Sequence, residues 1–174
     1  MNITGHVQSG SVQKRAPAGR SAAGFSLVEL LITLVLLGIV LAIAVPSYRG
    51  WVDNSNLKGA GRMISSDFYD TRARAMAENR AYTITYSPEP ANTCRIQAAA
   101  VNDLAAVDET KTFGEYGTVR MTGVNGGSAA VTVTIQSRGS AAPNATVGLT
   151  NVRNSTGTVT VLMTGRAHVT YSMQ

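Results

Sequence analysis

The longest uninterrupted hydrophobic run of the chain lies near its N-terminus, from Phe25 to Val45. Its 21 residues include a single charged side chain, that of Glu29. An α-helix of this length rises about 30 Å, which is the thickness of the hydrocarbon core of a bilayer. The run therefore predicts a membrane-spanning helix. A carboxylate inside such a helix is unfavourable by roughly 2.5–3.5 kcal/mol, so Glu29 needs a cationic partner or a shallow position.

Beyond Pro46 the hydrophobic positions recur at steps of three and four residues, which is the spacing of one helix face. Charged residues such as Arg62 and Asp70 separate them, so the pattern predicts one long helix that continues to about Asn79 with one buried side. Asp70 and Arg74 are spaced for an i,i+4 ion pair on the solvent side. The positions that recur on the buried side are Leu57, Ala60, Gly61, Ile64, Phe68, Ala75 and Asn79.

The rest of the chain consists of short runs rich in Val, Thr, Ile and Tyr, separated by Gly, Pro and Asn. Such runs are typical of antiparallel strands joined by turns. The stretch Asn102–Glu115 has four acidic residues and no hydrophobic period, so we expect a surface loop there. The fold class is therefore α+β, a long N-terminal helix packed against a C-terminal antiparallel β-sheet domain. The predicted strands are 81–86, 95–101, 118–121, 130–136, 146–150, 158–163 and 168–172.

The start of the apolar run carries a second signal: a glycine, then an aromatic residue, and a glutamate four residues after the aromatic. This stretch, Gly24-Phe25-Ser26-Leu27-Val28-Glu29, closely resembles the prepilin signature of type IV pilins and type II secretion pseudopilins. The resemblance implies that a prepilin peptidase cuts after Gly24 and methylates Phe25. It implies that Glu29 then pairs with the Phe25 amine of an adjacent subunit. It also implies that the helix can unwind between Gly38 and Pro46 inside a filament, which makes these two residues the helix-breaking positions.

Two other interpretations of the apolar run fit it less well. An ordinary signal-anchor helix leaves Glu29 unexplained. A secretory signal cut at Ala42-Ile43-Ala44 conflicts with the usual hydrophobic length of about 7–15 residues. The prepilin interpretation divides the chain into a cleaved leader (1–24), a membrane-spanning and filament-core helix segment (25–46), an amphipathic helix (47–80) and a β-rich domain (81–174).

The formal net charge of +5 is concentrated in the predicted leader, which contains Lys14, Arg15 and Arg20. Without these three, 12 basic residues face 10 acidic ones. Positive charge before a membrane span keeps that end in the cytoplasm. We therefore expect a single-pass protein of the bacterial inner membrane with its C-terminal domain in the periplasm, and later in a pilus or pseudopilus. The partners that the resemblance implies are the prepilin peptidase, other pilins or pseudopilins in a helical filament, and the inner-membrane assembly platform.

Three weaker motifs resemble the GspH/FimT branch of pseudopilins. They are the arginine-rich helix end followed by a strand (71–84), the strand ending in Arg138-Gly139, and the turn Gly165-Arg166. Some FimT-like pilins bind DNA through arginines at this last turn. The resemblance therefore makes Arg138, Arg153 and Arg166 candidate phosphate contacts, since no acidic residue follows Glu115. A few separated charges without interleaved aromatic residues bind nucleic acid weakly, so exposed arginines without a DNA role are the favoured interpretation.

No group of residues predicts catalysis, a metal site or a cofactor. His168 is the only histidine after the leader, and Cys94 is the only cysteine, expected half-buried in a strand. One cysteine excludes an intrachain disulfide. The sequence thus predicts a structural subunit rather than an enzyme. It leaves open whether the filament is a type IV pilus or a type II secretion pseudopilus, and keeps DNA binding by a FimT-like minor pilin as the alternative.

Overall fold

The computed structural model describes residues 24–174. The predicted leader, apart from Gly24, lies outside the described residues, and so do its three positive charges. The first element, α1 (Leu27–Ala77), is 51 residues long. Gly38 and Pro46 both lie inside α1, and neither interrupts it in the single chain. Unwinding between them in a filament stays a prediction.

The C-terminal end of α1 is closed by a residue in the left-handed conformation. Asn79 has φ of 49°, which asparagine tolerates better than most residues. The chain then folds back, and the amide of Arg80 donates to the carbonyl of Ala75 at 3.2 Å. This bond satisfies one of the carbonyls that every helix end leaves without a partner. The sequence prediction of a helix end near Asn79 is therefore confirmed.

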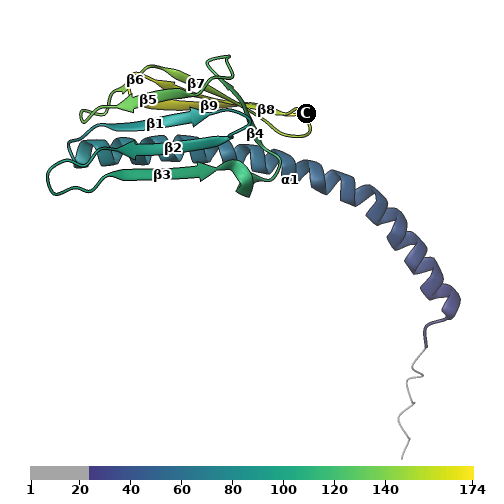
Figure 1. Cartoon of the computed structure of the whole chain (residues 1–174). Helices are drawn as coiled ribbons and strands as arrows, with labels where there is room; N and C mark the ends of the chain where they lie inside the picture. The colour runs from purple at the N-terminus through teal and green to yellow at the C-terminus, as the bar shows by residue number, and fades with distance from the viewer. Residues whose placement is uncertain (1–23) are drawn as a thin grey trace, which may run out of the picture. The chain divides into compact units, whose positions relative to one another are not determined.

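The strands form two antiparallel sheets (Figure 1). The first sheet has the order β3-β2-β1-β5-β6 and the second the order β4-β7-β8-β9. A 3-10 turn, η1 (Phe113–Tyr116), separates β3 from β4. The strands are β1 (Tyr82–Ser87), β2 (Thr93–Ala98), β3 (Val107–Thr112), β4 (Arg120–Val124), β5 (Val131–Ile135), β6 (Ala141–Ala142), β7 (Ala145–Thr150), β8 (Thr156–Leu162) and β9 (Arg166–Ser172).

All seven predicted strands are present, and the α+β class is confirmed. The predicted loop Asn102–Glu115 is wrong, because it contains strand β3 and most of η1. This strand lies at the edge of its sheet, and only Val107 and Lys111 are half-buried in it. An edge strand exposed on both faces shows no hydrophobic alternation, so the sequence pattern could not reveal it. The two-residue strand β6 was also missed.

One hydrophobic core joins the C-terminal part of α1 to both sheets within the compact unit formed by residues 41–174. Ile64 and Phe68 of α1, Ile84 of the first sheet and Val159 of the second are all fully buried. Every apolar position predicted for the buried side of the helix is confirmed, whereas Asn79, which the same spacing included, is exposed. The same side also buries two polar residues that the pattern did not predict, Asp67 and Thr71.

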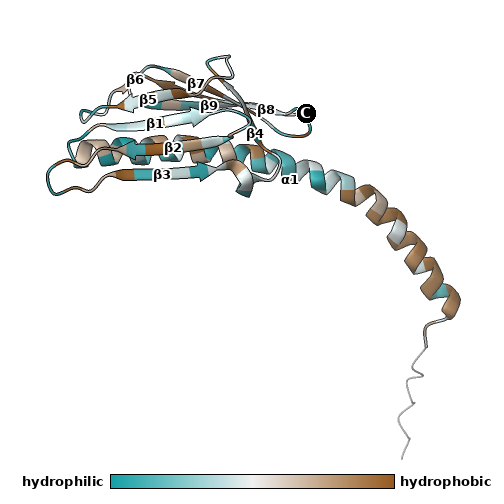
Figure 2. Ribbon diagram, in the orientation of Figure 1, coloured by the Kyte–Doolittle hydropathy of each residue, from teal (hydrophilic) through white to brown (hydrophobic). Residues whose placement is uncertain are grey.

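The N-terminal part of α1 has a different surface. All its large apolar side chains between Leu27 and Val45 are exposed. Figure 2 shows this part as almost continuously hydrophobic, whereas the rest of α1 alternates. By length and composition the segment is sufficient to cross a membrane.

Candidate functional site

The prepilin-like residues form the non-helical lead-in to α1. Residues 24–26 have no regular structure, and the helix begins at Leu27. Ser26 is its N-cap, because its hydroxyl oxygen accepts a hydrogen bond from the amide of Val28 at 3.3 Å. Phe25 is 81% exposed. The Gly24–Phe25 bond therefore lies in an accessible, non-helical position just before the first helical turn.

The position of Glu29 in the first turn of α1 has an electrostatic consequence. The free amide groups at a helix N-terminus carry partial positive charge, which favours a carboxylate there. Glu29 is exposed and has no ion-pair partner among the described residues. Its carboxylate is thus available to a cation outside this chain.

The two glycines of this region meet no atoms of their own chain. A Cβ built on Gly24 or on Gly38 would have nothing within 4 Å. Packing within the chain therefore does not require glycine at either position. If glycine is needed there, the requirement must come from another molecule.

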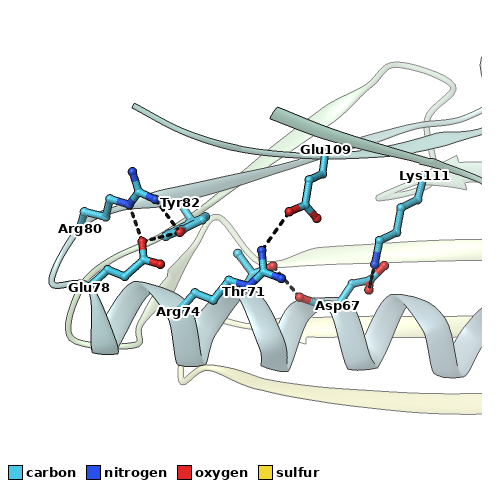
Figure 3. A network of polar contacts seen from close by, with 8 residues as sticks. All are labelled: Asp67, Thr71, Arg74, Glu78, Arg80, Tyr82, Glu109 and Lys111. Atoms are coloured by element: carbon cyan, nitrogen blue, oxygen red, sulfur yellow. Dashed lines mark hydrogen bonds and ion pairs between the residues drawn. The ribbon is translucent and has the colours of Figure 1, made fainter. Parts of the chain in front are cut away.

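The arginine-rich end of α1 organises a polar network at the corner between α1 and β1 (Figure 3). The guanidinium of Arg80 donates to Glu78 Oε2 at 2.6 Å and to the hydroxyl of Tyr82 at 2.9 Å. It also donates to the carbonyls of Ala99 and Ala105, at 2.9 and 2.7 Å. Arg80 is only 6% exposed. One buried side chain thus fixes the helix end, the first strand and both ends of the loop between β2 and β3.

The protonation of this corner follows from the same contacts. The pKa of Glu78 lies below its ordinary value, because the Tyr82 hydroxyl donates to its carboxylate and Arg80 lies beside it. The pKa of Tyr82 is raised by burial and by that hydrogen bond to Glu78. The cluster therefore holds a carboxylate and a neutral phenol, both fixed by the guanidinium of Arg80.

Edge strand β3 is attached to α1 by two ion pairs, which Figure 3 also shows. Lys111 pairs with the buried carboxylate of Asp67, and this hydrogen bond raises the pKa of Lys111. Arg74 pairs with Glu109 at 3.0 Å. The expected i,i+4 pair between Arg74 and Asp70 is wrong, because the guanidinium reaches across to the strand instead.

The three candidate DNA contacts do not come together on one surface. Arg138 and Arg166 lie on neighbouring turns, which meet where Arg72 donates to the carbonyl of Gly139 at 2.8 Å. Arg153 packs instead on Gly50 of α1, where a Cβ would lie 2.8 Å from its Nη1 atom. Since 22 helical residues separate positions 50 and 72, the two locations are about 33 Å apart along α1.

The Gly-Arg turn between β8 and β9 has a structural explanation. Gly165 has φ of 75°, which disfavours any side chain. A Cβ there would collide with the carbonyl of Gly139 and with Arg72. Glycine at this position therefore lets the two turns pack against each other, whether or not the following arginine binds anything.

The remaining chemically reactive side chains do not form a site. Cys94 is fully buried rather than half-buried as expected, and burial raises the pKa of its thiol to about 12. His168 lies on the exposed face of edge strand β9. The described residues contain no cluster of His, Cys, Asp and Glu that could hold a metal ion.

The structure also reveals residues that the sequence patterns did not single out. Arg80, Tyr82 and Asp67 had no assigned role, although they build the polar corner and the attachment of β3. An arginine directly after the helix-ending Asn79, followed two residues later by a tyrosine, was the available signal. The structural role of Arg80 depends on the carbonyls of residues 99 and 105, and no local sequence pattern links these residues to Arg80.

Comparisons with known proteins agree with this geometry. Residues 19–45 match the family model described as the prokaryotic N-terminal methylation motif. The chain is 33% identical over 87 residues to the fimbrial protein EcpC of Eikenella corrodens. The match covers 45% of this chain and spans 57%, little more than half, of that relative.

Solved structures resemble the fold at low sequence identity. One is the type IV minor pilin FimU of Pseudomonas aeruginosa, with a TM-score of 0.52 and 15% identity over 69% of this chain and 92% of that one. Another is the minor pseudopilin EpsH from the type 2 secretion system of Vibrio cholerae, with a TM-score of 0.51 and 9% identity over 67% and 97%. At such identities the likeness concerns the fold.

The methylation motif, the long helix with its β-sheet domain and the fimbrial relative together support one class. In its N-terminal motif and in its fold, the chain resembles type IV pilins and pseudopilins.

Proposed function

We propose that this chain is a minor pilin or pseudopilin of the GspH/FimT branch, a structural subunit of a type IV pilus or a type II secretion pseudopilus. The observation that carries the proposal is the order of three features. An accessible Gly24–Phe25 bond precedes Glu29 in the first turn of an exposed apolar helix, and that helix leads into a domain with a complete core. In a chain built this way, the apolar surface of the helix stays uncovered after the domain folds and is available for assembly.

Each processing and assembly residue then has a defined task. A prepilin peptidase cleaves after Gly24, in the non-helical segment before α1, and methylates the new terminus at Phe25. The span keeps the chain in the inner membrane, with its domain in the periplasm, until the assembly platform takes it up. In the filament the exposed surface from Leu27 to Val45 packs against neighbouring helices. Glu29 pairs with the Phe25 amine of the next subunit, because that terminus is a cation that every subunit supplies.

The substitution Gly24→Leu tests the processing step. A bulky side chain next to the cleaved bond is expected to block the peptidase and leave the leader attached, and mass spectrometry of the membrane fraction measures this directly. Gly38→Ala is the matched control, because a Cβ there is also in open space within the chain. It should be cleaved normally. A normally processed, N-methylated Phe25 in Gly24→Leu would contradict the proposal.

DNA binding by a FimT-like minor pilin is the alternative, and one observation favours it. The turns that carry Arg138 and Arg166 meet beside Arg72. Arg153 is distant, so at most these neighbouring arginines would contact phosphates, with a log–log salt slope of roughly −2 to −3. We expect little binding of labelled duplex DNA at ~150 mM salt by fluorescence anisotropy. Low-micromolar binding that Arg166→Ala abolishes and Arg153→Ala retains would make DNA capture the leading function.

A further inference from the structure

An exposed aromatic pair follows the apolar run directly. Tyr48 and Trp51 are 65% and 68% exposed, and their ring centroids lie 6.1 Å apart. They occupy one side of α1, three residues apart, and neither ring joins the core. Trp51 is the only tryptophan of the chain. Two large rings left in the open at the end of a membrane-spanning segment need an explanation that folding of the domain does not provide.

The turn between β7 and β8 lies at the same end of the domain. Asn151 donates to the side chain of Asn54 on α1 at 3.0 Å, which attaches the turn to the helix. Arg153 then packs on Gly50, one residue before Trp51, and Val152 stays 59% exposed. The end of the domain next to the span thus presents an apolar side chain from a second element.

The charges around these residues leave a small net charge of +1. Arg49 and Arg153 are positive, and Asp53 on the next turn of α1 is negative. Such a surface does not strongly attract anionic lipid. It fits the headgroup region in general, where tryptophan and tyrosine are enriched and where arginine extends its charged end into water.

The length of helix supports the same location. From Leu27 to Trp51 the helix rises about 36 Å, more than the roughly 30 Å of the hydrocarbon core and close to the 40–45 Å of a bilayer with its headgroups. With Trp51 in one headgroup region, the first turn of the helix reaches the other. Glu29 would then lie about 33 Å from Trp51 along the helix, near the edge of the hydrocarbon rather than at its centre.

We propose that Tyr48, Trp51 and the Val152–Arg153 turn form a membrane-interface contact, on which the folded domain rests in the phospholipid headgroup region before assembly. This inference rests on the proposed function, because it requires the apolar run to span the bilayer. The contact sets the depth of the helix, and so keeps the Glu29 carboxylate close to the opposite headgroups.

The test uses the full chain reconstituted in phosphatidylcholine vesicles and the emission of Trp51. Lipids brominated near the glycerol end of the acyl chain should quench this emission more than lipids brominated near the methyl end. Adding anionic lipid should change the quenching little, because the local net charge is only +1. Emission that neither lipid quenches, in chains that an alkaline wash leaves in the vesicles, would overturn the inference. So would unquenched emission that shifts with protein density, since a second copy would then cover Trp51.

Two variants move the single tryptophan, whose emission is measured, to other positions. Tyr48→Trp combined with Trp51→Phe should be quenched like the unsubstituted chain. Met163→Trp combined with Trp51→Phe should not be quenched, because Met163 is exposed on the turn between β8 and β9 at the other end of the domain. Equal quenching of both variants would show a domain lying flat on the bilayer and contradict the proposed contact. Loss of the chain from washed vesicles would instead refute the membrane span, and with it the proposed function.

Discussion

The two parts of α1 differ in where their partners lie. Between Leu27 and Val45 every large apolar side chain is exposed, although no other part of the chain is as hydrophobic. Between Leu57 and Ala75 the helix is rich in charged residues, yet one side of it is buried under two sheets. Hydrophobic content therefore does not decide which part is covered within the chain.

The difference lies in the pattern rather than in the amount of hydrophobic surface. A helix that is apolar all round cannot be covered by one sheet on one side, and it needs lipid or several other helices. A helix with a single apolar side is satisfied by a sheet packed on that side. One continuous helix can therefore supply an intermolecular surface with its first part and an intramolecular core with its second.

The largest effect is expected from substituting Glu29, the one charged residue in the exposed N-terminal part of α1. Glu29→Leu removes the carboxylate that we propose to pair with the neighbouring terminus. Incorporation into sheared filaments should fall at least about tenfold, which corresponds to 1.4 kcal/mol of lost pairing. Insertion in the membrane should be unaffected or improved, because the buried charge is gone. Thr33→Leu, one turn further along the same helix, is the control and should assemble normally. Equal incorporation of the two variants would refute the pairing.

Alanine substitutions in the exposed and in the buried part of α1 test whether only the buried part stabilises the domain. Ile64→Ala should destabilise the domain by about 2–5 kcal/mol, because it leaves a cavity in the core. Leu36→Ala should change the stability of the domain by less than about 0.5 kcal/mol, because Leu36 contacts no core. Labelling of Cys94 in the detergent-solubilised full chain is a suitable measurement, since this single cysteine is fully buried until the domain unfolds. Equal effects of the two substitutions would mean that the domain depends on the apolar part.

The attachment of β3 to α1 gives a smaller effect. Lys111→Met keeps the apolar stem but leaves the Asp67 carboxylate buried without its cation. We expect a loss of about 1–3 kcal/mol in urea denaturation followed by circular dichroism. Arg74→Met removes an exposed pair and should cost about 0.2–1 kcal/mol. A larger effect for Arg74 than for Lys111 would show that burial does not set the strength of these pairs.

The smallest expected effect is a change in pH dependence at the polar corner. The pKa of Glu78 is lowered in the folded chain, so its contribution to stability is complete above the ordinary value of 4.5 and is lost as pH falls through the lower, folded value. Glu78→Gln keeps an acceptor oxygen without the titration. Its stability should therefore decline less steeply with acid than that of the unsubstituted domain in thermal denaturation between those two values. Parallel acid profiles would assign the pH dependence to other carboxylates, such as Asp108, whose pKa is also lowered.

Local periodicity made most of the fold predictable. The step from continuous to three- and four-residue spacing after Pro46 correctly located the buried face of α1, and alternation located seven strands. Strand β3 was missed because most of its side chains are exposed, and because its ladder with β2 and its ion pairs to α1 leave no hydrophobic alternation in the sequence. The burial of Cys94 was underestimated for a related reason, since strand pattern alone does not say that a helix covers that face.

The sequence by itself determined the apolar run, the prepilin-like segment before it and the α+β class, because each depends on residues that are neighbours along the chain. Only the tertiary structure decided how distant residues combine. It separated Arg153 from Arg138 and Arg166, and it gave Arg80 its carbonyl partners in a loop some twenty residues away. It also brought the Val152–Arg153 turn to the end of the domain that carries Trp51. The physical reason is that helix and strand periods report only which side of an element is apolar, whereas polar contacts depend on which elements the folded chain places side by side.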